Sequence, residues 1–172
     1  MRPAHIPEDP VPGEDPIAYV TRLAREKAQV VFDEIAAGAI DVQSLAVLGA
    51  DTTVTLDGQI LGKPEDREDA ARILRKLSGR SHRVITGVAL VTHEAVEVAA
   101  EVTAVQFLTL SDEEIAAYIA TGEPMDKAGA YGIQGLAARW IPRVEGCYFN
   151  VMGLPLALVA TMLESRRISA SN

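Results

Sequence analysis

The stretch LAVLGAD at residues 45–51 is the part of the sequence from which the fold class can be predicted. A short, continuous apolar run is typical of a strand that is buried on both faces. We therefore predict a strand over 45–50 that presents the carboxylate of Asp51 at its C-terminal end. At the carboxyl edge of a sheet, such a group can serve as a metal ligand or a general base. A capping or turn aspartate is the alternative that the sequence leaves open.

A predicted helix precedes this strand, and further helices and β-rich segments follow it. This order predicts an α/β protein with a mixed sheet in one compact unit. Asp57-Gly58 is the strongest hairpin signal, because this pair favours the tight turn between two antiparallel strands. Ser111 and Glu114 form the pattern of a capping box at a helix start. The predicted helices cover 16–37, 65–77, 112–121 and 155–166, and the predicted long β-rich segments cover 82–92 and 95–108.

Length and charge exclude several classes of protein. The chain has 172 residues, 48% of them apolar and 23% charged, which is ordinary for one globular domain. The net charge of −8 argues against wrapping a nucleic-acid polymer, since such proteins carry a basic footprint. A small phosphate compound can still bind an acidic protein through a local basic pocket or a metal.

Cysteine content and the apolar runs bear on the compartment. The single Cys147 excludes an internal disulfide framework and a zinc site of several cysteines. The uncharged run 146–163 contains Asn150, Gly153 and Pro155, so we predict a buried strand, a turn and a helix start there rather than a membrane span. With a proline-rich start and no apolar leader, the protein is expected in the cytoplasm.

The P-loop, a familiar phosphate-binding motif, is absent, but a set of polar residues remains. The segment GQILGK at 58–63 is one residue short of a P-loop, and Pro64 replaces the hydroxyl residue that would bind Mg²⁺. The remaining candidates are Lys63, Asp126-Lys127 and Gln134, which lies in a glycine-rich loop. A solvated lysine and a loop salt bridge are the alternatives for the first two. A carboxylate with lysines and an amide indicates an enzyme that handles phosphate.

Several longer motifs, in this order, resemble those of the Maf family from about residue 8 to residue 164. They are GADTTV (49–54), LGKP (61–64), LSGRSH (77–82), VITGV (84–88), GEPMDKAGAYGIQG (122–135) and NVMGLPL (150–156). The resemblance implies a Maf/ITPase-like fold, with a mixed twisted β-sheet flanked by helices. It also implies a cytoplasmic nucleoside triphosphate pyrophosphatase that hydrolyses dTTP and UTP to the monophosphate and pyrophosphate, without partners among nucleic-acid polymers or membranes and with a homodimer as a candidate assembly.

The same resemblance implies roles for individual residues. Asp51 is the expected catalytic carboxylate and metal ligand, with Glu8 as a second ligand for a divalent cation, Mg²⁺ or Mn²⁺. Thr52 and Gln134 are associated with substrate choice. The expected phosphate-binding residues are Lys27, Lys63 and Lys127.

One part of the family pattern is missing from this sequence. Family members begin with a strand and a Ser-x-x-Arg-Arg loop that binds phosphates, and no such motif occurs here. We therefore expect a single Maf-like domain over 1–172 that is truncated at its N-terminus relative to the family. Either Met1 is an internal methionine of a longer reading frame, or the product is a weakly active or inactive nucleotide-binding protein with a regulatory role in cell division.

Overall fold

The structure, a computed structural model, describes residues 2–4 and 6–169. The chain divides into two compact units, and three of its strands contribute one part to each. Unit 1 comprises Met1–Asp51, Thr86–Glu101 and Gly153–Asn172, and unit 2 comprises Thr52–Ile85 and Val102–Met152. The organisation as a single domain stays a prediction.

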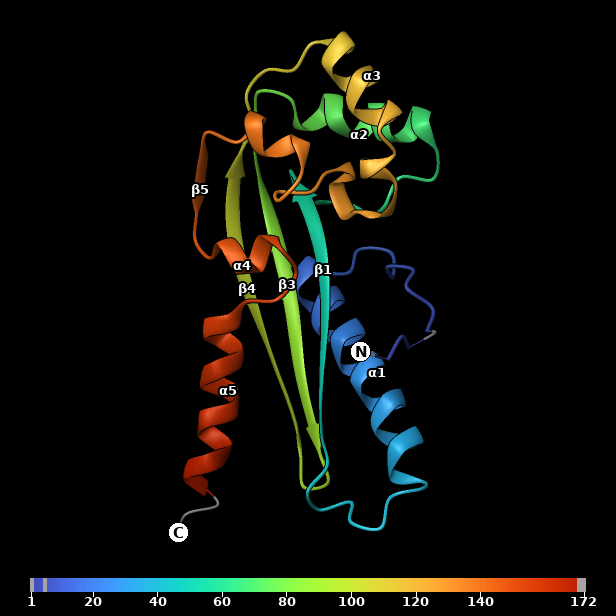
Figure 1. Cartoon of the computed structure of the whole chain (residues 1–172), viewed down its shortest axis with the longest axis vertical. Coiled ribbons are helices and arrows are strands. Elements are labelled where there is room, and N and C mark those ends of the chain that lie inside the picture. The colour runs from blue at the N-terminus through green and yellow to red at the C-terminus, as the bar shows by residue number, and fades with distance from the viewer. Residues whose placement is uncertain (1, 5, 170–172) are drawn as a thin grey trace. The chain divides into compact units, whose positions relative to one another are not determined.

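Groups of one or two strands are separated by helices along the chain (Figure 1). The α-helices are α1 (Pro16–Ala36), α2 (Arg67–Leu77), α3 (Asp112–Ala120), α4 (Tyr148–Val151) and α5 (Leu156–Ser169). The 3-10 helices are η1 (Glu123–Asp126), η2 (Ala128–Ala130) and η3 (Leu136–Trp140). The strands are β1 (Ala46–Leu56), β2 (Gln59–Leu61), β3 (Ser81–Thr92), β4 (Val96–Gln106) and β5 (Arg143–Glu145).

The strands form one sheet in the order β2-β1-β3-β4-β5, and helices flank it, as predicted. Val54 lies opposite Leu61, and Val105 lies opposite Val144, in antiparallel pairs. The sheet is antiparallel, whereas a mixed sheet was predicted. Tight turns join β1 to β2 and β3 to β4, and a tight turn reverses the chain direction. Strands β4 and β5 also pair antiparallel, although α3 and the 3-10 helices lie between them in the chain.

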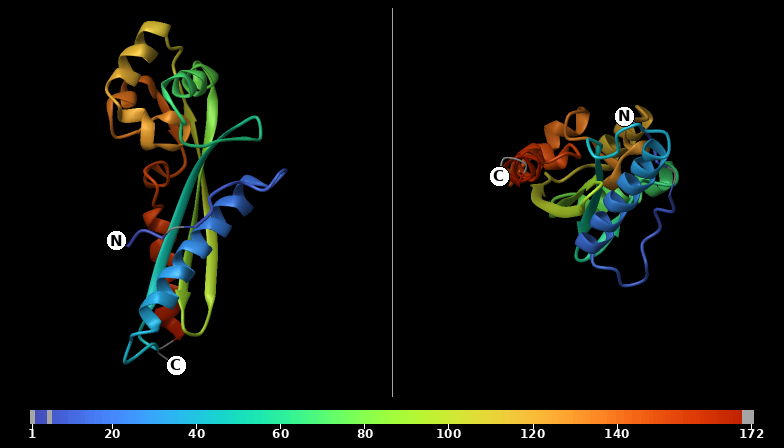
Figure 2. Two further views of the ribbon diagram at one scale, coloured as in Figure 1. Left: turned by 90° about the vertical axis from the view of Figure 1, so that its right-hand side faces the viewer. Right: turned by 90° about the horizontal axis from the view of Figure 1, so that it is seen from below.

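In unit 1, helices cover both faces of the sheet. Ala89 and Val91 on β3 pack against α1, and Val88 and Leu90 pack against α5. Successive side chains of a strand point to opposite faces, so this alternation places the two helices on opposite sides of the strands (Figure 2). Helix α1 begins where predicted, because the Asp15 carboxylate accepts hydrogen bonds from the first free amides of the helix and Pro16 occupies its first position.

Unit 2 has its own apolar core, to which α2, α3, η3, the strands and the loops contribute. Phe107, Tyr118 and Trp140 are buried there, and the ring of Trp140 stands edge-on to that of Tyr118 at a centroid distance of 5.0 Å. Helix α3 carries the predicted capping box of Ser111 and Glu114. These contacts hold the loops that connect η1, η2 and η3.

Two predictions for local structure are wrong. The predicted strand over 45–50 is not separate from the hairpin strand before Asp57: β1 runs unbroken to Leu56, because the β-branched residues that follow Asp51 favour extended structure. Asp51 therefore lies within the strand. The segment around Tyr148 is the short helix α4, where a buried strand was predicted. None of the described helices is both long and apolar enough to cross a membrane.

Candidate active site

Helix α1 brings Lys27 to β1. Lys27 shares one helical face with Leu23 and Ala24, which are fully buried, so its stem leaves the helix on the side that packs against the sheet. Gly49 on β1 allows this close approach, because a side-chain carbon at that position would overlap the Ala24 carbonyl. The helix and the strand thus meet two residues before Asp51.

Glu8, Lys27 and Asp51 form a cluster in unit 1, called here the Lys27 cluster. The ammonium nitrogen of Lys27 lies 2.6 Å from Asp51 Oδ1 and 2.6 Å from Glu8 Oε1. The Asp51 side chain is 13% exposed, that of Lys27 22% and that of Glu8 46%. One cation therefore bridges a largely buried carboxylate and a more exposed one, and the sequence-predicted residues of this unit lie together.

The charges of the Lys27 cluster perturb its members and a neighbouring tyrosine. Burial alone would lower the pKa of Lys27, but the hydrogen bonds to Asp51 and Glu8 outweigh it and raise that pKa above 10.5. Burial, followed by the negative charges of Asp51 and Glu8, raises the pKa of Tyr19. The Tyr19 hydroxyl remains a donor and gives a 2.8 Å hydrogen bond to the Glu8 carbonyl. This bond holds the backbone that carries Glu8.

A second anchor holds the segment after Glu8. Arg22 Nε and Nη2 each donate a 2.8 Å hydrogen bond to the Glu14 carboxylate, and Arg22 Nη2 also reaches the Asp9 carbonyl at 3.3 Å. The guanidinium, together with the Val11 amide, lowers the pKa of Glu14 to about 2. The two-pronged geometry of arginine suits this task, because it fixes direction as well as distance.

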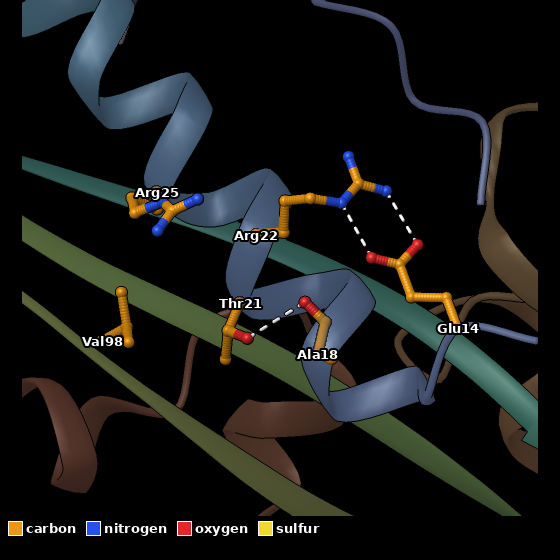
Figure 3. A pocket seen from close by; sticks show the side chains of 6 residues that line it. All are labelled: Glu14, Ala18, Thr21, Arg22, Arg25 and Val98. Carbon is orange, nitrogen blue, oxygen red and sulfur yellow. Dashed lines mark hydrogen bonds and ion pairs between the residues drawn. The ribbon is translucent and has the colours of Figure 1, made fainter. Parts of the chain in front are cut away.

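A cavity of about 260 Å³ lies beside this anchor (Figure 3). In Figure 3, the two carboxylate oxygens of Glu14 face the guanidinium of Arg22, while Arg25 points to another side. The cavity is lined by Glu14, Ala18, Thr21, Arg22, Arg25 and Val98. None of the sequence-predicted site residues lines this cavity, so we do not include it in the candidate active site.

The predicted phosphate-binding lysines of unit 2 lie on two connected loops. The Gly129 amide donates a 3.0 Å hydrogen bond to the Gly62 carbonyl, which ties the loop of Lys127 to the turn of Lys63. Lys127 Nζ lies 2.6 Å from Asp126 Oδ1, and the hydrogen bond from Lys127, followed by the charges of Lys127 and Lys63, lowers the pKa of Asp126. The predicted loop salt bridge of Asp126 and Lys127 is thus present. Lys63 itself is exposed.

The two residues expected to choose the substrate have different surroundings in unit 2. Gln134 is exposed in a tight turn, in which the Gly135 amide donates a 3.1 Å hydrogen bond to the Gly132 carbonyl. Thr52 is half-buried in β1, directly after Asp51. The Gln134 amide donates no hydrogen bond to any residue that the structure describes, which leaves it available for a ligand.

The candidate donors for a divalent cation, as the family resemblance implies them, are the carboxylate oxygens of Asp51 and Glu8. Within the described ranges, no group of three or more histidine, cysteine, aspartate or glutamate side chains could hold a metal ion. Asp51 and Glu8 nevertheless fit Mg²⁺ or Mn²⁺ in chemistry, because these ions prefer oxygen ligands and are commonly held by one or two carboxylates together with substrate phosphates. The two carboxylates already share one cation, the ammonium of Lys27.

Sequence reasoning missed the residues that hold the candidate residues in place. Tyr19 lies on the buried face of α1, where it looks like a core residue, and its hydroxyl contact is eleven residues away in the chain. Arg22 and Glu14 look like ordinary solvated charges. Glu123 lies in the motif GEPMDKAGAYGIQG at 122–135, but nothing in the sequence predicts a role for it. In the structure, its carboxylate accepts hydrogen bonds from the loop of Gln134.

Comparison with known proteins identifies the family. Residues 1–166 match the family described as Maf-like protein. A dTTP/UTP pyrophosphatase of Geobacter sulfurreducens is 53% identical over 96% of this chain and 83% of that protein. One of Koribacter versatilis is 52% identical over 95% of this chain and 81% of the relative, and one of Aromatoleum aromaticum is 52% identical over 94% and 78%. With the family motifs spread over nearly the whole sequence, the chain belongs to the Maf family.

Proposed function

We propose that this protein is a nucleoside triphosphate pyrophosphatase that hydrolyses dTTP and UTP to the nucleoside monophosphate and pyrophosphate. The contact of Lys27 with Asp51 carries the proposal, because it gives a chain of the Maf family a largely buried, charge-paired carboxylate. The names of relatives with about 50% identity support the substrates.

In this proposal, Asp51 is the general base. Its carboxylate takes a proton from a water molecule as the water oxygen forms a bond to the α-phosphorus. The bond from that phosphorus to the bridging oxygen breaks, and pyrophosphate leaves with the electron pair. Asp51 is suited to the task because strand β1 and the Lys27 contact fix its position before substrate arrives.

Lys27 orients Asp51 and balances its charge. A charge-assisted hydrogen bond is about twice as strong as a neutral one, and it restricts the carboxylate to one direction. Lys27 and the unit 2 residues Lys63 and Lys127 are assigned to the phosphates, whose negative charge an acidic protein must neutralise locally. Thr52 and Gln134 are assigned to the choice of base.

Asp51 and Glu8 would hold the divalent cation, which supplies charge neutralisation for the triphosphate when bound. The ammonium of Lys27 lies against both carboxylates, and it keeps them together before the nucleotide binds. We expect the enzyme to act in the cytoplasm, where nucleoside triphosphates are made and used.

The test is the product pattern of the wild-type protein. Incubated with dTTP and MgCl₂, the protein should release dTMP and pyrophosphate in equal amounts, without dTDP or inorganic phosphate. Chromatography of the nucleotides with a pyrophosphate-specific assay measures both products. Saturable dTTP binding without turnover would instead identify a nucleotide-binding protein and contradict the proposal.

A further inference from the structure

A buried tyrosine and a glutamate hold the loop that carries Gln134. The Tyr118 hydroxyl donates a 2.8 Å hydrogen bond to Glu123 Oε1 and accepts a 3.2 Å hydrogen bond from the Gly132 amide. The two carboxylate oxygens of Glu123 accept from the Leu136 amide, each at 3.1 Å. Tyr118 and Glu123, called here the clamp, therefore bind the backbone two residues before Gln134 and two residues after it.

The clamp lies directly under the turn. A side-chain carbon at Gly135 would overlap the Glu123 carboxylate, so a larger residue there would displace that carboxylate from its present position. The Glu123 carbonyl accepts a 3.1 Å hydrogen bond from Lys127 Nζ. The residue that holds the Gln134 turn thus also holds the predicted phosphate-binding lysine of the same loop.

The clamp uses polar groups that packing alone does not require. The Tyr118 side chain is 1% exposed, and a phenylalanine would fill the same space. Its hydroxyl is instead paired on both sides, as donor to Glu123 and as acceptor from Gly132. Burial and the bond to Glu123 raise the pKa of Tyr118, so the hydroxyl keeps its proton and continues to donate. The hydrogen bonds of this pair therefore hold the loop that carries the exposed Gln134.

We propose that Tyr118 and Glu123 are positioning residues for base selection, acting through the backbone that presents Gln134. This inference rests on the proposed pyrophosphatase function. A glutamine amide has a donor end and an acceptor end, so a mobile one can turn to pair with either the thymine or the cytosine edge. Discrimination requires that the peptide carrying it be held, since only then does the wrong base leave a polar group unpaired.

The test compares Tyr118→Phe and Glu123→Ala with the wild type. kcat and KM are measured for dTTP, UTP and dCTP, and amide hydrogen exchange is measured at Gly132 and Leu136. Glu123→Gln serves as the conservative variant, because its carbonyl oxygen can still accept from Leu136. Tyr148→Phe, at a tyrosine 45% exposed, and Glu113→Gln, at an exposed residue of α3, are the matched controls.

For Tyr118→Phe, we expect the ratio of kcat/KM for dTTP to that for dCTP to fall by about tenfold or more, with faster exchange at Gly132. Glu123→Ala should act in the same direction with faster exchange at Leu136, and Glu123→Gln should retain most of the selectivity. The controls should leave the ratio unchanged. An equal loss for all three substrates would overturn the inference, because it would show a structural role only.

Hydrolysis by the wild-type protein tests the proposed function separately from the clamp. If the wild type hydrolyses none of the three nucleotides, the pyrophosphatase proposal fails, and the clamp is then judged by the ratio of the dissociation constants for dTTP and dCTP. If Tyr118→Phe loses preference for dTTP, so that the ratio of the dissociation constant for dTTP to that for dCTP rises, the result supports the clamp. An unchanged ratio, despite faster exchange at Gly132, would overturn it.

Discussion

Lys27 on α1 donates a 2.6 Å hydrogen bond from its ammonium group to Asp51 on β1. The two residues are 24 positions apart in the chain, and they meet because Gly49 lets the helix lie close to the strand. The contact gives the candidate catalytic carboxylate a fixed direction. It also makes the stability of this part of the fold depend on the same charges as the proposed activity.

Replacing Lys27 by methionine keeps the apolar stem and removes the charge. We expect Lys27→Met to lower the free energy of unfolding by about 1–2 kcal/mol near neutral pH, because Asp51 loses a charge-assisted partner, with allowance for partial exposure. dTTP hydrolysis should fall by about tenfold or more, since a misplaced base costs orders of magnitude. Urea unfolding and steady-state kinetics measure the two effects.

We also expect the stability difference between the wild type and Lys27→Met to depend on pH in the alkaline range. The native pKa of Lys27 lies above 10.5, so the pair stabilises the native state fully below 10.5 and loses its contribution as pH rises through the native pKa. The stability difference between wild type and Lys27→Met should therefore shrink above about pH 10.5. Lys76→Met, at a half-buried lysine of α2, is the control and should show no such convergence. A constant difference would count against the ion pair.

Buried His82 predicts a loss of stability in acid. Its side chain is 2% exposed, its Nε2 lies 2.8 Å from the Tyr131 hydroxyl, and burial lowers its pKa from 6.5 to about 4. Between these values the unfolded chain binds a proton that the native protein does not, so stability falls as pH decreases from 6.5 to about 4. The expected contribution is about 3 kcal/mol.

His82→Gln should flatten this acid dependence. The variant removes the titrating group, so its unfolding free energy should change less between about pH 7 and pH 4.5 than that of the wild type. His93→Gln, at an exposed histidine, should follow the wild type. If His82→Gln has the same acid slope as the wild type, His82 is not the titrating group.

Asn150 connects α4 to the sheet of unit 2. It is fully buried, and its Nδ2 donates to the Val84 carbonyl at 3.0 Å and to Thr103 Oγ1 at 2.9 Å. We expect Asn150→Ala to lower the unfolding free energy by about 2–4 kcal/mol, because a buried carbonyl and hydroxyl lose a donor. Denaturant unfolding measures the cost. A change below about 0.5 kcal/mol, as for a typical surface substitution, would contradict this role.

Features encoded by neighbouring residues could be predicted from the sequence. The start of α1 at Pro16, the hairpin at Asp57-Gly58 and the capping box of α3 agree with the structure, since each depends on contacts within a few residues. The family resemblance implied only that Lys27 and Asp51 both serve the active site, and their direct contact was not predicted. The local sequence around either residue does not predict a contact with the other.

Features set by distant contacts were missed. The only element that the sequence predicts between residues 122 and 153 is a buried strand near Tyr148, whereas the structure has η1, η2, η3, β5 and α4 there. These elements are too short to show a helical or strand period, and contacts such as that of Tyr118 with Glu123 hold them. The break expected at Asp51 is absent, because the β-branched residues continue the strand although the apolar run stops there.

The central claim is that Asp51, held by Lys27, performs the hydrolysis, and the direct measurement is pyrophosphate release from dTTP by Asp51→Asn. The variant keeps the shape of the side chain but cannot accept the proton, so we expect turnover to fall by about 100-fold or more with the fold intact by circular dichroism. Asp57→Asn, at the exposed hairpin turn, is the matched control and should retain activity. Wild-type turnover in Asp51→Asn would contradict the account.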